Sequence, residues 1–105
     1  MSNLLIVDDE QSYRQLLSLV FEGDGHHIRT AINGRDALEK LQTEPAEVII
    51  TDVRMPDMDG IALLKAAHEI NSDIGFVLMT AFALRAFKRA VFADKRLFVK
   101  RFFDD

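Results

Sequence analysis

The chain has 105 residues, which is a typical length for one compact domain with a single hydrophobic core. Apolar residues make up 49% of it and charged residues 29%, a balance typical of soluble globular proteins that excludes disordered and fibrous chains. The absence of cysteine excludes disulfides and thiolate metal sites, and the net charge of -4 argues against general nucleic-acid binding.

Charge is distributed unevenly along the chain. Residues 1–84 hold 6 Lys and Arg against 14 Asp and Glu, a net charge of -8, whereas residues 85–105 hold 7 against 3, a net charge of +4. No stretch resembles a signal peptide or a membrane span, so we expect a cytoplasmic protein without membrane contact. The basic, phenylalanine-rich end could also suit nucleic acid or a membrane, but its charges lie among residues that a helix would bury.

The first third of the chain predicts a strand, a helix and a second strand. Residues 4–7 form an unbroken apolar run, which is typical of a strand covered on both faces. Apolar residues recur with helical spacing over residues 11–21, and Gly23 ends the predicted amphipathic helix. Residues 26–31 predict a weaker strand.

The middle of the chain continues this alternation. Asn33 and Gly34 predict a turn, and residues 37–41 predict a short helical face that Pro45 closes. A strand follows from Val48 to Asp52.

The next segment predicts a loop, a third helix and a fourth strand. Residues 53–59 contain a proline and several charges, which predict a loop, and Gly60 should begin the helix. Three apolar residues are expected on its buried side: Ile61, Leu64 and Ala67. Residues 76–79 predict a strand that ends at Thr80.

Strands that alternate with helices in this way predict an α/β fold, with a doubly wound parallel sheet. In such a sheet the ligand site lies beyond the carboxyl ends of the strands. Asp8 and Asp9 follow the first strand, Asp52 ends the third, and Thr80 ends the fourth. We therefore expect three carboxylates and one hydroxyl to meet at one edge of the sheet.

Crowded carboxylates repel one another unless a cation or a proton neutralises them. Mg²⁺ prefers oxygen ligands and often completes its coordination with water and phosphate oxygens. An aspartate can also attack phosphorus to form an acyl phosphate, and phosphoryl transfer needs positive charge around the moving oxygens. The acidic edge therefore predicts a magnesium-assisted phosphoryl acceptor.

Three segments resemble the receiver domains of bacterial two-component response regulators, especially those that precede sigma-54-type activators. The segments are Ile6–Glu10, Ile50–Gly60 and Leu78–Phe82. The resemblance runs from the start of the chain to about Phe82. It implies a flavodoxin-like fold and one receiver domain over residues 1–105, with an atypical segment from about residue 83.

The resemblance also implies roles for individual residues. Asp52 would accept the phosphoryl group, and Asp8 and Asp9 would be the acidic pair at Mg²⁺. The backbone carbonyl of Arg54 would be a further metal ligand.

Two residues near the carboxyl end complete the implied site. Thr80 would bind the phosphoryl group, and a lysine after the fifth strand would pair with it, for which Lys100 is the only good match.

The implied function is a signalling phosphoacceptor and not a turnover enzyme. A sensor histidine kinase would be the donor, and an effector domain or downstream regulator would respond to the phosphorylated form. The alternative is a receiver fold that no longer switches and acts as an interaction or dimerisation module.

The segment after Phe82 departs from the family pattern. The spacing from Thr80 to Lys100 is short, Arg101 replaces the usual proline, and too few residues follow for the usual fifth helix. One long helix over residues 83–103 is the alternative to a helix followed by a strand. Because either arrangement leaves apolar surface without cover, we expect a homodimer, with the tail exchanged between subunits as one form of it.

Overall fold

A computed structural model describes residues 2–79 of the chain. Strands and helices alternate throughout this part, as the sequence predicts. The elements in chain order are β1 (Asn3–Val7), α1 (Gln11–Gly23), β2 (His27–Ala31), α2 (Gly34–Thr43), β3 (Val48–Asp52), α3 (Gly60–Ile70) and β4 (Gly75–Met79).

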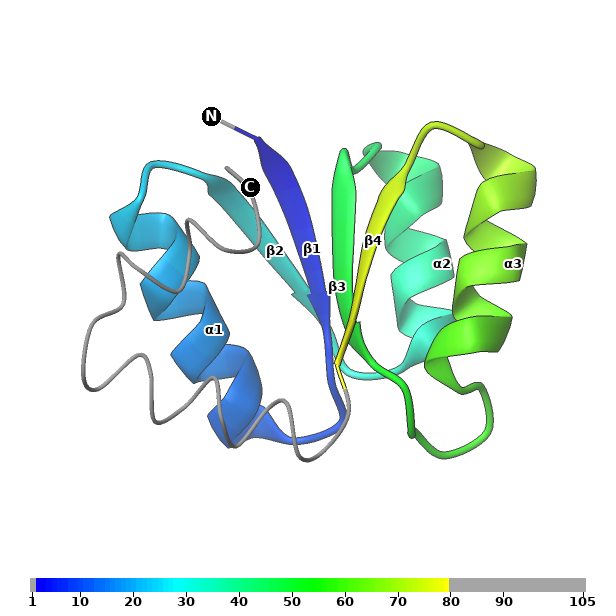
Figure 1. Cartoon of the computed structure of the whole chain (residues 1–105), viewed down its shortest axis with the longest axis horizontal. Helices are drawn as coiled ribbons and strands as arrows, with labels where there is room; N and C mark the ends of the chain where they lie inside the picture. The colour runs from blue at the N-terminus through cyan, green and yellow to red at the C-terminus, as the bar shows by residue number, and fades with distance from the viewer. Residues whose placement is uncertain (1, 80–105) are drawn as a thin grey trace.

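The four strands form one parallel sheet in the order β2-β1-β3-β4 (Figure 1). The chain moves from β1 to β2 on one side and then returns to β3 on the other, so the strand order reverses between β1 and β3. This arrangement is that of a flavodoxin-like doubly wound sheet, in which the reversal point opens a crevice at the carboxyl ends of the strands. The predicted fold class is confirmed.

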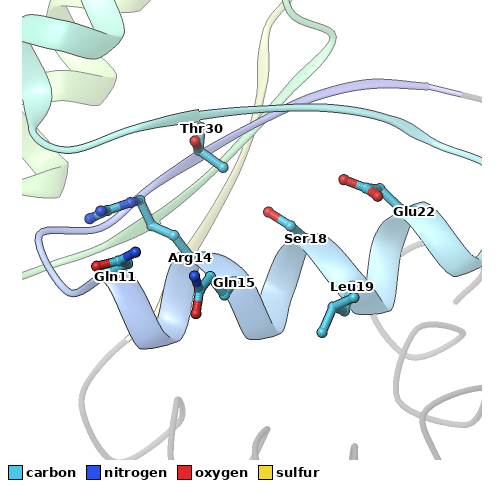
Figure 2. A pocket seen from close by; sticks show the side chains of 7 residues that line it. All are labelled: Gln11, Arg14, Gln15, Ser18, Leu19, Glu22 and Thr30. Carbon is cyan, nitrogen blue, oxygen red and sulfur yellow. The ribbon is translucent and has the colours of Figure 1, made fainter.

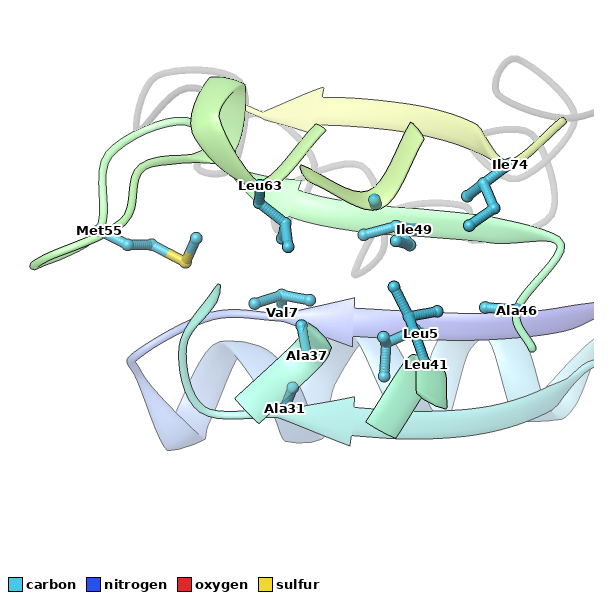
Figure 3. Close-up of a cluster of buried hydrophobic side chains, with 11 residues drawn as sticks. Leu5, Val7, Ala31, Ala37, Leu41, Ala46, Ile49, Met55, Leu63 and Ile74 are labelled. Atoms are coloured by element: carbon cyan, nitrogen blue, oxygen red, sulfur yellow. The ribbon is translucent and has the colours of Figure 1, made fainter. Parts of the chain in front are cut away.

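Two apolar clusters lie on the opposite faces of the sheet. Figure 3 shows the cluster between the sheet and the helices α2 and α3, in which Leu5 and Ile49 of the strands meet Leu41 and Leu63 of the helices. On the other face α1 packs against the sheet through its three buried residues, Leu17, Val20 and Phe21. Figure 1 shows α1 on one side of the sheet and the other two helices on the opposite side. The central strands β1 and β3 are therefore buried on both faces, which explains their mainly apolar sequences.

Two local predictions have different outcomes. The chain bends at Ile32 and Asn33, beside the predicted turn, and Asn33 also caps α2 by accepting a hydrogen bond from the Asp36 amide at 2.8 Å. The predicted buried side of α3 was partly wrong, since Ala67 is buried as expected, whereas Ile61 is 41% exposed and Leu63 is fully buried in its place. Leu63 and Ala67 lie one helical turn apart and face the core together.

Several predictions fall outside residues 2–79. They concern Thr80 and Lys100, the segment from about residue 83 to 105, the missing fifth helix and the long-helix alternative. Within residues 2–79, no helix is both long enough and apolar enough to cross a membrane.

Candidate functional site

Three carboxylates meet where the two central strands end. Asp8 and Asp9 directly follow β1, and Asp52 is the last residue of β3. The strands are neighbours in parallel register, with Val7 opposite Thr51, so their carboxyl ends lie side by side. One carboxylate oxygen from each aspartate lies within 4.8 Å of the other two. The expected acidic convergence is therefore present, at the point where the strand order reverses.

The three aspartates differ in burial. Asp8 is only 2% exposed, Asp52 is half-buried, and Asp9 is exposed. Backbone amides orient two of them, since Asp8 Oδ1 accepts a hydrogen bond from the Glu10 amide at 2.9 Å and Asp52 Oδ1 accepts one from the Arg54 amide at 3.1 Å. Asp8 thus forms the buried base of the site, and Asp9 and Asp52 are more accessible.

The environment of Asp8 disfavours its charged form. Burial is the main cause that raises the pKa of Asp8 from 3.8 to about 6, and the negative charges of Asp52, Asp9 and Glu10 add to it. The hydrogen bond from the Glu10 amide acts in the opposite direction. Near neutral pH the Asp8 carboxylate is therefore mostly ionised in unfavourable surroundings, and a cation at the cluster would relieve that cost.

The loop after Asp52 is held very close to β3 by Gly60. A Cβ atom at Gly60 would lie 2.5 Å from the backbone oxygen of Asp52, which is too short for any real contact. The Gly60 amide donates to the Val53 oxygen at 2.8 Å, so α3 begins directly beside the end of β3. Glycine at this position allows α3 to begin this close to the end of β3.

The same loop contains a tight turn centred on Asp57. Asp57 has a φ of 70°, and the Met58 amide donates to the Pro56 oxygen at 2.8 Å. A three-residue turn with positive φ is strained for a residue other than glycine. The loop is therefore held in a fixed shape by its surroundings.

Met58 connects this loop to α2. A Cβ atom at Gly34 would lie 2.6 Å from Met58 Sδ, so the thioether side chain rests directly on the first residue of the helix. Glycine at the start of α2 makes room for this contact.

The structure brings together only part of the predicted site. Asp8, Asp9 and Asp52 lie within one cluster, and Arg54 lies two residues from Asp52 with its amide directed at that carboxylate. The metal and phosphoryl roles of these residues stay predictions, as do those of Thr80 and Lys100, which lie outside the described range.

Sequence reasoning missed one residue that contacts the site. Arg14 Nη1 donates a hydrogen bond to the backbone oxygen of Asp8 at 2.7 Å. The sequence did offer a signal for this contact. Arg14 lies one turn into the predicted helix that follows the acidic end of the first strand.

The donor set fits a hard divalent cation. Mg²⁺ takes oxygen ligands and is commonly bound through one or two carboxylates, with water and phosphate oxygens as the remaining ligands. Asp8, Asp9 and Asp52 offer carboxylate oxygens at a suitable spacing, and neither cysteine nor histidine belongs to this cluster. When bound there, Mg²⁺ would supply the positive charge that phosphoryl transfer requires.

Comparisons with known proteins place the chain in a family. Residues 4–103 match the response regulator receiver domain family. This chain belongs to the response regulator receiver family. Members of the family are signalling phosphoacceptors of two-component systems, interact with histidine kinases and effector domains, and bind Mg²⁺ in an acidic pocket.

Two curated relatives differ in how much of their own length this chain matches. The response regulator receiver protein CpdR of Brucella abortus is 39% identical over 83 residues, which are 79% of this chain and 69% of that protein. The regulatory protein AtoC of Escherichia coli is 40% identical over 82 residues, which are 78% of this chain but only 18% of AtoC. The similarity to AtoC therefore concerns one small part of that regulator.

A solved structure supports the same fold. The response regulator TrrA of Thermotoga maritima, solved in complex with Mg²⁺ and beryllofluoride, is 33% identical to this chain with a TM-score of 0.72. The match covers 77% of this chain and 70% of TrrA.

Proposed function

We propose that this chain receives a phosphoryl group from a histidine kinase on the carboxylate of Asp52. The observation that carries the proposal is the meeting of Asp8, Asp9 and Asp52 at the β1/β3 reversal point of a receiver fold. Asp52 is the half-buried member of the three, so it is reachable by a donor. The Arg54 amide holds one of its oxygens and thereby orients the carboxylate.

In the proposed reaction, an oxygen of Asp52 forms a bond to phosphorus. The phosphorus–nitrogen bond of the donor phosphohistidine breaks, and the released imidazole nitrogen keeps the electron pair and takes up a proton. Water later hydrolyses the acyl phosphate and regenerates the carboxylate. The chain would thus promote only its own phosphorylation and dephosphorylation.

Four ligands are proposed for Mg²⁺: the carboxylates of Asp8, Asp9 and Asp52, and the backbone carbonyl of Arg54. The support is the carboxylate spacing and the buried charge of Asp8, which a cation would stabilise. We further propose that Thr80 and Lys100 contact the phosphoryl oxygens, on the family resemblance alone.

The proposed partners are a histidine kinase and an effector domain or downstream regulator in the cytoplasm. A homodimer, with the tail from about residue 83 exchanged between subunits, belongs to the same proposal. Its motivation is the apolar surface that the departure of this segment from the family sequence pattern would leave without cover. Light scattering at high micromolar concentration should show a dimer, and a monomer would contradict it.

Incubation with acetyl phosphate and Mg²⁺ tests the proposal. Intact-mass spectrometry should show one added phosphoryl group on the parent chain and none on Asp52→Asn. Asp73→Asn serves as a matched control, because Asp73 is an exposed aspartate just before β4 and does not belong to the acidic cluster. A parent chain that gains no phosphoryl group, or an Asp52→Asn variant that gains one equally well, would contradict the proposal.

The same family fold and the altered tail allow a second function, that of an interaction module without switching. Calorimetric titration with Mg²⁺ separates the two. Binding in the high micromolar to millimolar range supports the phosphoacceptor, whereas no binding supports the interaction module.

A further inference from the structure

Arg14 lies near the start of α1 and contacts the backbone of Asp8, at the acidic end of β1. Its side chain reaches back toward the amino end of the helix, as long helical side chains do (Figure 2). There its Nη1 atom donates to the Asp8 backbone oxygen at 2.7 Å. A charged donor at this distance makes a strong hydrogen bond.

The Asp8 carbonyl needs such a donor. β1 ends at Val7, and Asp8 is only 2% exposed, so its carbonyl has lost both the strand ladder and most of its access to water. A buried carbonyl without a partner is costly. Arg14 removes that cost.

Arg14 also completes a set of bonds that fixes every polar group of Asp8. The Asp8 amide donates to the Ala31 oxygen of β2 at 3.2 Å, and the Asp8 carboxylate accepts from the Glu10 amide at 2.9 Å. The guanidinium of Arg14 holds the remaining group, the carbonyl. Since the Arg14 amide donates to the Glu10 oxygen at 3.2 Å, Arg14 joins both ends of the turn from Asp8 to Glu10.

The hydrogen bond goes to the carbonyl of Asp8 and not to its carboxylate. Arg14 therefore takes no oxygen of the carboxylate, and it sets the position of that group through the backbone. Electrostatically, a guanidinium near a cation site opposes cation binding. Any benefit that Arg14 brings to metal binding must therefore come from geometry.

We propose that Arg14 is a positioning residue of the metal site, which holds the turn from Asp8 to Glu10 in the conformation that receives Mg²⁺. The inference rests on the proposed magnesium site and names a residue that acts on it without touching the ion. Partners that orient metal ligands typically change metal affinity by about 10- to 100-fold when they are removed.

Calorimetric titration of the complete chain with Mg²⁺ tests this role in three variants. Arg14→Met keeps the aliphatic stem but removes the charge and all donors, and it should weaken Mg²⁺ binding by about tenfold. Arg14→Lys keeps a charged donor and should recover most of the affinity. Arg35→Ala removes the same charge from an exposed position on α2 and should leave binding unchanged or slightly tighter.

The direction of the change distinguishes positioning from electrostatics. Loss of a nearby positive charge alone would strengthen Mg²⁺ binding, so weaker binding in Arg14→Met can only reflect lost geometry. Equal or tighter binding in this variant than in Arg35→Ala overturns the inference. A parent chain that binds no Mg²⁺ overturns the proposed function instead.

A measurement on the unaltered chain keeps the inference testable if Arg14→Met does not fold. The guanidinium protons of Arg14 should exchange slowly with solvent and show NMR coupling to the Asp8 carbonyl, both before and after Mg²⁺ is added. Rapid exchange of these protons in the magnesium-bound chain would contradict the inference.

Discussion

The two ends of the parallel sheet both carry acidic residues, but they use them differently. At the carboxyl end, Asp8, Asp9 and Asp52 direct carboxylate oxygens to within 4.8 Å of one another, and Asp8 is buried. At the amino end, Glu47 and Asp73 are exposed and line an open groove of about 490 Å³. Glu47 accepts a hydrogen bond from the Asn3 amide at 3.2 Å, which links the segment before β3 to the start of β1.

The difference shows that acidic composition alone does not make a site. Parallel strands bring their ends together at both ends of the sheet. Among residues 2–79, acidic side chains converge with one of them buried only at the carboxyl end. Burial gives the charge of Asp8 a free-energy cost, which a ligand can remove. Asp73 is exposed and lies outside the cluster.

The largest expected effect compares two glycines at opposite ends of the sheet. Gly60→Ala should lower the free energy of unfolding by about 3 kcal/mol, because its Cβ would overlap the Asp52 oxygen. Gly75→Ala at the amino end should change it by less than about 1 kcal/mol, since its nearest contact would be an ordinary 3.5 Å. Urea unfolding measures both free energies, and equal losses of stability would contradict the close approach of Gly60 to the end of β3.

Metal affinity should distinguish the two acidic ends. Asp8→Asn should weaken Mg²⁺ binding by about 10- to 100-fold, because it removes a negative oxygen ligand from the cluster. Asp73→Asn should leave the affinity within about twofold, because an exposed charge outside the cluster is screened by salt. Calorimetry at one ionic strength measures both variants, and similar losses would indicate a general charge effect.

The stability of the metal-free chain should depend on pH through Asp8. Its folded-state pKa of about 6 lies above its ordinary value of 3.8, so the folded chain binds this proton more tightly and loses stability as pH rises from 3.8 through 6. Asp8→Asn should therefore be more stable than the parent by about 2 kcal/mol at pH 8 and by little at pH 3.5. Glu47→Gln removes an exposed carboxylate outside the cluster and serves as the control. Urea unfolding in the presence of a chelator checks this, and a gain that is independent of pH would contradict it.

The smallest expected effect concerns the cap of α3. Asp59→Ala should cost about 1 kcal/mol, because the Asp59 carboxylate accepts the Ala62 amide at 2.8 Å. Asp73→Ala should cost less than about 0.5 kcal/mol, since within residues 2–79 its carboxylate accepts no hydrogen bond. Thermal unfolding ranks the two variants, and a reversed order would contradict the assignment of the cap.

The sequence predicted the sheet and the acidic edge because both depend on local patterns. The apolar runs that end at Asp8 and Asp52 identify buried parallel strands, and parallel strands bring their carboxyl ends to one edge. The error at Ile61 arose because α3 is apolar over most of its surface, so periodicity alone could not choose between Ile61 and Leu63 as the buried residue.

Contacts between segments far apart in the chain could not be predicted from the sequence. The pKa of Asp8 is raised mainly by burial, which cannot be read from residue spacing. The packing of Met58 against Gly34 joins residues that are far apart in the chain. The hydrogen bond from Arg14 depends on the angle at which α1 leaves the strand end. Such features follow from packing in three dimensions and not from residue spacing.

The contact between Met58 and Gly34 connects the loop after Asp52 to α2, a helix that contributes no residue to the acidic cluster. Because the thioether fills the space where a side chain at Gly34 would stand, a shift of Met58 would change the packing against the first turn of α2. The backbone amides of Gly34 and Asp36 are therefore natural NMR reporters of events at the acidic edge, although neither residue contacts it.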